Sequence, residues 1–537
     1  MGVLAFARAT NGVVAMLEVK ERCDGSAVER AYIPPAPKPQ PGLLGPLALI
    51  RTLKRNPLEC WAVQHFEQPV VAGGLPIGHV LLVHEPRAIR RVLLDNAANY
   101  RKDRFQRRVL SAGLNDGLLS AEGEQWRLQR RVLAPMFARK TVMDFAPAMM
   151  GAAEALIDRW SALGDRATVD VAAEMARLTL EVLERTIFSD GFGSDAETIR
   201  LAMATYFNTI GKISPLDLLG VPDFVPRLSR LRVQSTLKFF EAEVDRVISF
   251  RRRILAEQPD RAPNDLLTHL LGARDTNTNG AFSEAEVRSN ILTFIAAGHE
   301  TTANTLSWAM FLLSQSPEWR QRVEAEADRE MTGPVRGVAD RLVETRAVIE
   351  ETIRLYPPIA AISRVAVDGD DLNGEPVRPG SLVVISPDVL HRHRLLWDRP
   401  NAFDPRRFLG RAHAAIDRFA YLPFGAGPRK CIGSTFALQE ATLVLAAILK
   451  HFSFQLRPGH PVWPTLRVSL RPANGLPMIL SKRSSNDPTT IGDRRGDQFM
   501  TPERLGTMHQ PAPDAPHNPK LRARDALAAM EECPFRR

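Results

Sequence analysis

Apolar residues recur at helical spacing through the middle and the C-terminal part of the chain. Besides shorter helices between residues 150 and 270, this periodicity predicts four that matter for function: Glu122–Met136, Val233–Leu255, Ser283–Ser314 and Phe436–Leu449. The last of these is apolar with almost no breaker, which is typical of a helix buried on all sides. The pattern therefore predicts a mainly helical fold.

Shorter apolar segments, interrupted by glycine or proline, predict small β-sheets in addition to the helices. The residues from Val70 to Val83 are broken by three glycines, which favours two strands joined by a turn. Ile359–Arg364 has the composition of a strand edge, and Phe452–Ser481 alternates in the manner of a hairpin sheet. We therefore expect a mainly α fold with small β-sheets.

Both ends of the chain differ from the part between them. Residues 1–33 form an N-terminal extension without a transmembrane helix, because its apolar start is too short and too often interrupted by polar residues. Residues 34–42 are rich in proline and predict an extended entry to a single domain over residues 34–482. Residues 483–537 are rich in proline, glycine and charge, which predicts a disordered tail.

Composition and charge exclude several classes of protein. Hydrophobic residues make up 45% of the 537 residues and charged residues 24%, values ordinary for a soluble globular protein. The four cysteines, Cys23, Cys60, Cys431 and Cys533, show no spacing that predicts disulfides, zinc or an iron–sulfur site. The net charge of +9 comes from basic residues mixed with acidic ones, so we expect no nucleic-acid partner and favour an acidic protein.

A glycine-rich stretch over residues 424–433 concentrates the candidate chemistry around Cys431. Three glycines and a proline exclude regular helix or strand, so the stretch is predicted to be a loop that holds the cysteine sulfur in place. Its position before a helix N-terminus, next to Arg429 and Lys430, is expected to lower the pKa of the thiol. A cysteine in such a loop is by itself more often a small buried residue than a ligand.

Polar residues also interrupt the apolar helix predicted over Ser283–Ser314. Ala297 and Thr301 lie one turn apart on one face, with Glu300 beside them. The small residues leave room for a diatomic ligand, and a threonine inside a helix can bond the carbonyl four residues back and bend the helix. Spacing alone leaves open a buried threonine satisfied by its own helix beside a solvated glutamate. We interpret His299 as a packing residue.

Two further pairs share helix faces. Trp126 and Arg130 are four residues apart, although an aromatic ring packed on a solvated arginine has the same spacing. Glu351 and Arg354 are three apart, and Arg407 lies further along the chain. An exposed pair contributes about 0.2–0.5 kcal/mol, whereas removing one partner of a buried pair costs about 3–5 kcal/mol.

Taken together, these motifs resemble the cytochrome P-450 family over residues 34–482. Its haem-thiolate loop is matched by Phe424, Gly427, Arg429, Cys431 and Gly433. The resemblance implies a helical prism that encloses haem b between the helix of Thr301 and the helix after Cys431. It also implies that the Cys431 thiolate is the ligand of the haem iron.

The resemblance implies roles for the other residues as well. Glu300 and Thr301 match the acid–alcohol pair that delivers protons to dioxygen, and Glu351, Arg354 and Arg407 match a buried network behind the haem. The expected haem contacts besides Cys431 are Trp126, Arg130, Arg364, His391, Phe424 and Arg429. The expected substrate-pocket residues are Ala297, Ile359, Ala360 and Val468.

The function implied is monooxygenation of an apolar small molecule of the fatty-acid or terpenoid kind. Electrons would come from a separate ferredoxin or flavodoxin with its reductase, docking near Arg131, Arg139, Lys140, Arg429 and Lys430. The alternatives are a peroxide-using peroxygenase, a haem-thiolate isomerase or dehydratase, and a non-catalytic haem sensor; the intact acid–alcohol pair argues against each. The resemblance also implies a soluble, cytoplasmic protein of bacterial type, with possible peripheral membrane contact through the apolar loop 215–226.

Overall fold

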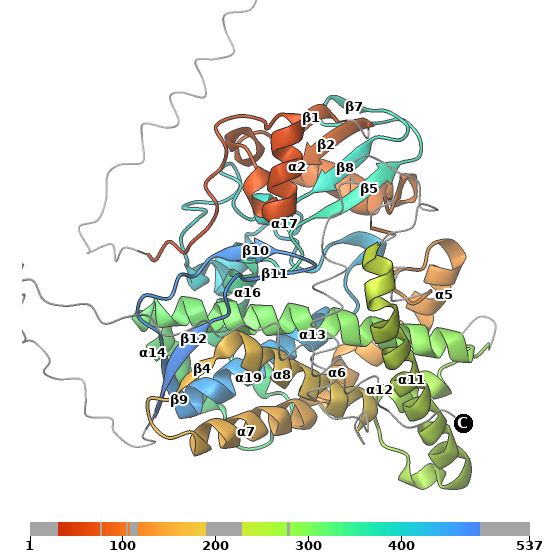
Figure 1. Ribbon diagram of the computed structural model, residues 1–537, viewed down its shortest axis with the longest axis vertical. Helices are drawn as coiled ribbons and strands as arrows, with labels where there is room; N and C mark the ends of the chain where they lie inside the picture. Colours follow the sequence, from red (N-terminus) through yellow and green to blue (C-terminus); the bar gives the residue numbers. More distant parts are fainter. Residues whose placement is uncertain are drawn as a thin grey trace, which may run out of the picture. The chain divides into compact units, whose positions relative to one another are not determined.

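A computed structural model describes residues 31–75, 78–103, 106–107, 116–189, 228–275 and 280–483 (Figure 1). The loop 215–226 and nearly all of both terminal segments lie outside these ranges. Within them the chain is mainly helical with four small sheets, as the hydrophobic pattern predicted.

The α-helices occupy most of the chain between residues 123 and 451. Their bounds are α2 Pro46–Arg55, α3 Pro86–Arg90, α5 Gly123–Leu133, α6 Arg139–Asp144, α7 Ala146–Ala162, α8 Val171–Leu183, α11 Leu228–Glu257, α12 Leu266–Gly272, α13 Glu284–Ser314, α14 Pro317–Glu330, α15 Val338–Arg341, α16 Val343–Leu355, α17 Pro387–Leu390, α18 Gly410–Ala414 and α19 Ser434–His451. The four helices predicted from periodicity are confirmed as α5, α11, α13 and α19, with bounds that differ by a few residues. Between Pro86 and Asp95 the chain is α-helical only to Arg90 and then π-helical over Arg91–Asp95.

Twelve strands form the sheets of the described part. Their bounds are β1 Val70–Leu75, β2 Gly78–Val83, β3 Tyr100–Arg101, β4 Thr168–Asp170, β5 Ile362–Ala366, β6 Asp370–Leu372, β7 Glu375–Val377, β8 Leu382–Ile385, β9 Phe452–Leu456, β10 Pro464–Leu466, β11 Leu470–Pro472 and β12 Pro477–Lys482. The predicted pair over Val70–Val83 is antiparallel β1–β2, with Val70 opposite Val83. It forms the edge of a sheet with the order β1-β2-β8-β5-β3.

The predicted C-terminal hairpin sheet is instead two separate pairings. Strand β12 pairs antiparallel with β9 and also with β4, which lies far earlier in the chain. Strands β10 and β11 pair only with each other, with Leu466 opposite Leu470. The turn between them covers residues 467–469, so the hairpin is a distinct unit beside the larger sheets.

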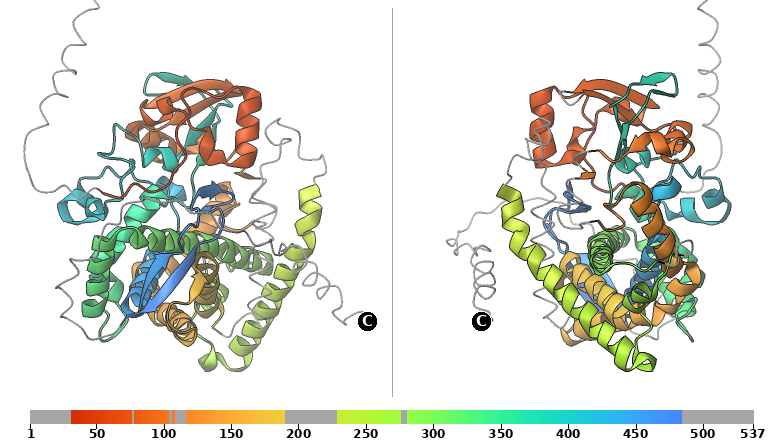
Figure 2. Two further views of the ribbon diagram at one scale, coloured as in Figure 1. Left: turned by 60° about the vertical axis from the view of Figure 1, so that its left-hand side comes forward. Right: turned by 90° about the vertical axis from the view of Figure 1, so that its right-hand side faces the viewer.

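Helix α13 runs through the middle of the helical part (Figure 1) and is seen nearly end-on in the right-hand view of Figure 2. It begins at Ser283, whose hydroxyl and the Glu286 carboxylate form a reciprocal capping box. Most of its 31 residues are buried on every side, which explains why the sequence shows little amphipathic character there. The exceptions lie around Ala297 and Thr301.

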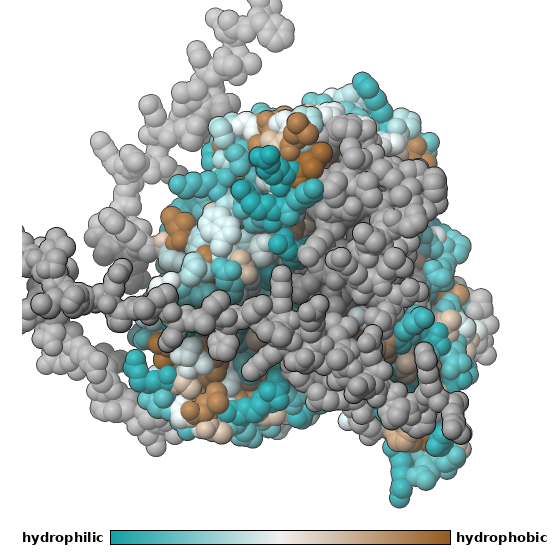
Figure 3. Space-filling model, viewed as in Figure 1, coloured by the Kyte–Doolittle hydropathy of each residue, from teal (hydrophilic) through white to brown (hydrophobic). Residues whose placement is uncertain are grey.

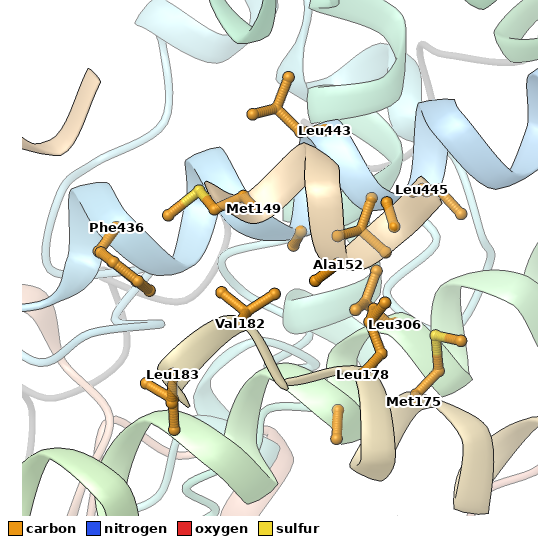
Figure 4. Packing of buried hydrophobic residues seen from close by; sticks show 14 of the residues in the cluster. Met149, Ala152, Met175, Leu178, Val182, Leu183, Leu306, Phe436, Leu443 and Leu445 are labelled. Atoms are coloured by element: carbon orange, nitrogen blue, oxygen red, sulfur yellow. The ribbon is translucent and has the colours of Figure 1, made fainter. Parts of the chain in front are cut away.

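The main hydrophobic core lies where helices α7, α8, α13 and α19 meet (Figure 4). Met149 from α7, Val182 from α8, Leu306 from α13 and Leu445 from α19 point into this core. Close packing of this kind means that loss of a single large side chain costs about 2–5 kcal/mol. Both helices expected to enclose the cofactor are therefore anchored in one rigid core.

The buried ion pair of Glu351 and Arg354 joins α16 to the segment that leads toward the Cys431 loop. Both side chains are fully buried, and two bonds of 2.6 and 2.8 Å make the pair bidentate. The Arg354 guanidinium also donates to the carbonyls of His391, Pro400 and Ala402. Arg407 approaches Glu351 to 3.6 Å.

The surface is mostly polar in the face shown in Figure 3, where apolar side chains of the described residues form only small spots. Among the described residues, no helix is both long enough and apolar enough to cross a membrane.

Replacing Arg354 by alanine is expected to lower the free energy of unfolding by about 3–5 kcal/mol, because it leaves a buried carboxylate and three backbone carbonyls without their donor. Arg336→Ala is the matched control, since Arg336 pairs with Asp144 at 2.8 Å at the surface. The control should cost less than about 1 kcal/mol. Denaturant unfolding of both variants measures the difference, and equal losses would contradict the importance of the buried pair.

Candidate functional site

The Cys431 loop is built by backbone bonds and tight turns. The amide of Cys431 donates to the carbonyl of Phe424 at 2.9 Å, which closes the loop. Gly433 follows as the residue before α19, and its amide donates toward the Cys431 sulfur. The loop therefore presents one sulfur from the N-terminal end of the buried helix α19, as the sequence predicted.

Gly427 makes this loop possible. Its φ is +68°, and a Cβ at this position would lie 1.7 Å from the carbonyl oxygen of Leu93. No side chain fits such an approach. Gly425 has the same φ, but the nearest atom to its Cβ would be 3.8 Å away, in Ile362. Glycine is therefore required at the two positions for different reasons. At Gly425 only the backbone conformation requires it, whereas at Gly427 the close contact with the backbone of Leu93 requires it as well.

The protonation state of Cys431 differs from the sequence prediction. The Gly433 amide, Arg130 and Lys430 lower its pKa in the expected direction, but burial outweighs them and raises the thiol pKa overall. The thiol lies deep in the protein, although part of the residue is exposed. The thiol is therefore not a free thiolate by itself, and a bound metal would deprotonate it.

Four cationic side chains act on one another near Cys431, and we call Lys102, Arg130, Arg364 and Arg429 the cation cluster. Burial together with mutual repulsion lowers the pKa of Lys102 to about 8 and that of Arg429 to about 10. Among the described residues, Glu122 is the carboxylate that pairs with the cluster, at 3.2 Å from both Lys102 and Arg429.

This arrangement fits the haem that the resemblance implies. In the described part of the chain, Glu122 and Asp103 are the carboxylates that act on these four cations, so an excess of positive charge remains in a half-buried place, which two propionate groups would neutralise. The described residues contain no group of three or more His, Cys, Asp or Glu placed to hold a metal ion. A metal bound through Cys431 would thus need most of its ligands from a cofactor, as haem iron does.

The predicted pair of Trp126 and Arg130 interacts with two different residues of the Cys431 loop. The guanidinium of Arg429 lies over the Trp126 ring at 4.1 Å, in cation–π geometry. Arg130 instead acts on Cys431. Trp126 therefore orients Arg429, a contact between residues about 300 positions apart that helical spacing could not reveal.

Lys102 and Glu122 are site residues that the sequence analysis missed. The ammonium group of Lys102 is buried and donates to the carbonyls of Leu119 and Ala121 as well as pairing with Glu122. Lys102 follows the two-residue strand β3, where no periodicity marks it. A buried lysine is recognisable only once the fold is known.

His391 lies in the scaffold next to the Cys431 loop. The side chain is fully buried, and its Nε2 accepts a bond of 2.9 Å from the amide of Leu422. Burial and the nearby Arg354 lower its pKa to about 3, so the ring is neutral. Its carbonyl accepts from Arg354, and its Nδ1 is buried without a hydrogen bond to a described residue. His391 therefore joins the Glu351–Arg354 pair to the Cys431 loop, and the expected contact with a haem propionate stays a prediction.

The middle of α13 opens onto the site, and we call the residues Ala297, Glu300 and Thr301 there the notch. Ala297 is exposed and Thr301 is half-buried, although almost all residues further along α13 are buried. The Thr301 hydroxyl donates to the Ala297 carbonyl at 2.7 Å, the bond expected from the sequence. His299 faces the other way, and its Nδ1 lies 3.1 Å from the Thr179 hydroxyl of α8. The packing interpretation of His299 is thus consistent with its buried contact.

Glu300 is a mostly buried carboxyl group beside Thr301. Burial raises its pKa, and the opposing effects of Arg471 and Ser469 are smaller. Its Oε2 is buried and makes no hydrogen bond to a described residue. A carboxyl group with a raised pKa holds its proton to higher pH than the solvated glutamate that the sequence left open.

The expected pocket residues differ in their surroundings. Ile359 is 43% exposed, whereas the side chain of Ala360 is 3% exposed and belongs to the main core. The Ala360 side chain therefore packs in the core, whereas the neighbouring Ile359 has an accessible side chain. The role of both as substrate-pocket residues stays a prediction. Val468 lies in the turn of the β10–β11 hairpin and is partly buried against the main core.

A groove of about 700 Å³ lies on the outer side of the Cys431 loop. It is lined by Phe424, Gly427 and Lys430 of the loop, by Arg139 of α6, and by Leu438 of α19. Four arginine or lysine side chains and two carboxylates line it, and one of the two, Glu350, is buried with a raised pKa. Of the basic residues expected to meet an electron donor, Arg139 and Lys430 lie in this groove, whereas Arg131 pairs with Asp275.

Gly427→Ala and Gly425→Ala should separate the two reasons for glycine in the loop. Each introduces a side chain at φ +68°, which costs about 1–2 kcal/mol. Gly427→Ala should cost about 1–3 kcal/mol more, because its Cβ collides with the Leu93 carbonyl. Thermal unfolding and haem content per chain measure the difference. Equal behaviour of the two variants would contradict the close approach.

Comparison with known proteins identifies the family. The family model for cytochrome P450 matches residues 34–478. The chain is 32% identical to cyclooctatin synthase of Streptomyces melanosporofaciens, covering 79% of this chain and 97% of that protein. It is 32% identical to cyclooctat-9-en-7-ol 5-monooxygenase of the same organism, covering 78% of this chain and 90% of the relative. It is also 31% identical to the bifunctional cytochrome P450/NADPH–P450 reductase 2 of Bacillus subtilis, covering 81% of this chain and 42% of that protein.

The family match spans the Cys431 loop, the notch in α13 and the buried network of α16 together, so the geometry and the comparisons agree. The chain belongs to the cytochrome P450 family of haem-thiolate oxidoreductases.

Proposed function

We propose that the protein hydroxylates an apolar small molecule of the terpenoid or fatty-acid kind, using dioxygen and electrons from a separate protein. The observation that carries the proposal is the notch in α13, where the Thr301 hydroxyl and the Glu300 carboxyl stand beside the exposed Ala297. A terpenoid-like substrate is supported by the two Streptomyces relatives, whose names describe enzymes of cyclooctatin chemistry.

In this proposal haem b is held by the Cys431 thiolate, and the cation cluster holds its propionates. The bound haem supplies dioxygen activation, which an electron-rich thiolate ligand favours. The Gly433 amide donates toward the sulfur and so limits how much charge the thiolate carries. Phe424 packs against the core beneath the loop, and Trp126 keeps the Arg429 guanidinium in position.

The chain's own part in the chemistry is to move protons and to exclude water. Glu300, with its raised pKa, would hold a proton at its carboxyl group. Thr301 would orient the dioxygen that accepts this proton, through a hydrogen bond from its hydroxyl. Ala297 leaves space at the notch, and Ile359 and Val468 would contribute apolar contacts to the substrate. The buried residues of α13 on either side of the notch keep bulk water away.

The alternative functions would use the Cys431 loop but not the polar residues in the middle of α13. A peroxygenase, an isomerase or dehydratase, and a haem sensor would each need the Cys431 loop. None of them needs a carboxyl group next to a hydroxyl in the middle of α13. The notch therefore favours monooxygenation.

Electrons would reach the haem through a donor docked at the groove outside the Cys431 loop. Lys430 and Arg418 are exposed there, and the Arg139–Asp340 and Arg346–Glu350 pairs lie nearby. A ferredoxin or flavodoxin carries the complementary acidic surface, and complementary charges speed association. The fused reductase of the Bacillus relative supports the need for such a donor.

Replacing Thr301 by alanine tests the proton-delivery role. The change removes a hydroxyl and little volume, so we expect a loss of about 1–2 kcal/mol in unfolding free energy and normal haem content. Reductant oxidation should continue, but a larger share of it should yield peroxide or water in place of product. The measurement is product formed per reductant oxidised, with any compound that shifts the Soret band as substrate.

Thr305→Ala is the control for this experiment. Thr305 lies one turn further along α13, is buried, and bonds the Thr301 carbonyl at 2.9 Å in the same manner. It should lose similar stability and keep the product ratio. A product ratio in Thr301→Ala as high as in the wild type would make Thr301 a packing residue and remove the main support for monooxygenation.

The docking proposal predicts salt-dependent reduction. With a [2Fe–2S] ferredoxin or a flavodoxin as donor, the stopped-flow reduction rate should fall roughly tenfold from low to physiological ionic strength. Arg418→Glu should slow reduction at low salt, because it reverses a charge at the groove. Lys54→Glu in α2, a helix that does not line the groove, should have little effect. A rate that is flat with salt would argue against electrostatic docking.

A further inference from the structure

The β10–β11 hairpin lies along α13 next to the notch (Figure 1). Ser469 in its turn accepts a bond of 2.8 Å from the Asn304 amide of α13, and both side chains are buried. The amide of Leu470 donates to the carbonyl of Pro358, just after α16. The hairpin is thus fastened to α13 and to the end of α16, so its side chains hold fixed positions relative to Glu300.

One of these side chains is a cation directed at the relay acid. The Arg471 guanidinium of β11 approaches the Glu300 carboxylate to 3.8 Å. The arginine is 31% exposed and the glutamate 13% exposed, so the pair is only partly screened by solvent. The contact joins residues 171 positions apart, and none of the sequence motifs includes Arg471.

Burial has the largest effect on the charge of Glu300, and the polar groups that oppose this effect come from the hairpin. Among the described residues, the groups that act on its carboxyl are the Arg471 guanidinium and the Ser469 hydroxyl, both from the hairpin. The neighbouring imidazole of His299 is turned toward Thr179 of α8. The approach of Arg471 engages Oε1, while Oε2 is buried without a bond to a described residue. Arg471 therefore acts on the carboxyl group through one of its two oxygens.

We propose that Arg471 is a positioning residue that sets the orientation and the charge of the Glu300 carboxyl group, and that the β10–β11 hairpin thereby governs the proton relay. The proposal rests on the relay role given to Glu300 above. The same hairpin carries Val468, an expected pocket residue, in its turn. Substrate contact and proton supply would therefore share one structural element.

The test follows the protonation of Glu300 directly, in the haem-loaded full chain. Infrared spectra of the wild type are recorded against pH, and the same spectra of Glu300→Gln are subtracted to isolate the signal of this carboxyl group. Arg471→Met should shift the midpoint of protonation to higher pH, since it removes the cation that favours the carboxylate. Arg471→Lys should restore the midpoint toward the wild type.

Arg467→Met is the matched control. Arg467 lies in the turn of the same hairpin, but its guanidinium donates to the backbone carbonyls of Arg55 and Leu466. Its removal should loosen the hairpin without moving the Glu300 midpoint, and thermal unfolding reports how much each variant loosens the fold. Because the infrared signal needs no turnover, it tests the pairing even if Thr301→Ala shows that the relay is absent.

Three results decide the proposal. An upward shift in Arg471→Met alone, reversed in Arg471→Lys, supports it. An unchanged midpoint in Arg471→Met overturns it, because Arg471 would then not act on the carboxyl group. Equal shifts in Arg471→Met and Arg467→Met also overturn it, since the effect would come from hairpin packing and not from the Arg471 charge.

Discussion

The bidentate ion pair of Glu351 and Arg354 is the interaction on which the rest of the site depends. The pair is fully buried, so water cannot solvate its two charges if it is broken. The guanidinium uses its remaining donors to bond the carbonyls of His391, Pro400 and Ala402. His391 then accepts from the amide of Leu422, two residues before Phe424. A continuous set of buried polar contacts thus runs from α16 to the loop that carries Cys431. The position of the Cys431 sulfur therefore depends on the position of α16.

The opposite side of the site is organised by a different kind of contact. Helix α13 is held along its length by apolar packing against α8 and α19, and its polar notch is formed by a short backbone bond from Thr301. The β10–β11 hairpin supplies a charge that the helix itself lacks. One side of the site is therefore rigid because of buried ion pairs, whereas the other is an apolar wall whose few polar groups are adjusted by a neighbouring element.

Local chemistry was readable from the sequence, and long-range chemistry was not. The helices α13 and α19 follow from periodicity, and the pairing of Glu351 with Arg354 and the bond from Thr301 to Ala297 follow from spacing within one helix. Lys102, the stacking of Arg429 on Trp126 and the approach of Arg471 to Glu300 join residues that only the fold brings together. The thiol pKa was predicted with the wrong sign because its main cause is burial, which is a property of the tertiary structure.

The cation cluster has a consequence for how the protein reaches its folded state. Without haem, Lys102, Arg130, Arg364 and Arg429 lie close together with fewer carboxylates than cations, and their mutual repulsion opposes folding. A dianionic cofactor that binds the folded chain would remove this repulsion and shift the folding equilibrium toward the native state by mass action. The free energy of unfolding therefore depends on cofactor occupancy as well as on the packing of the core.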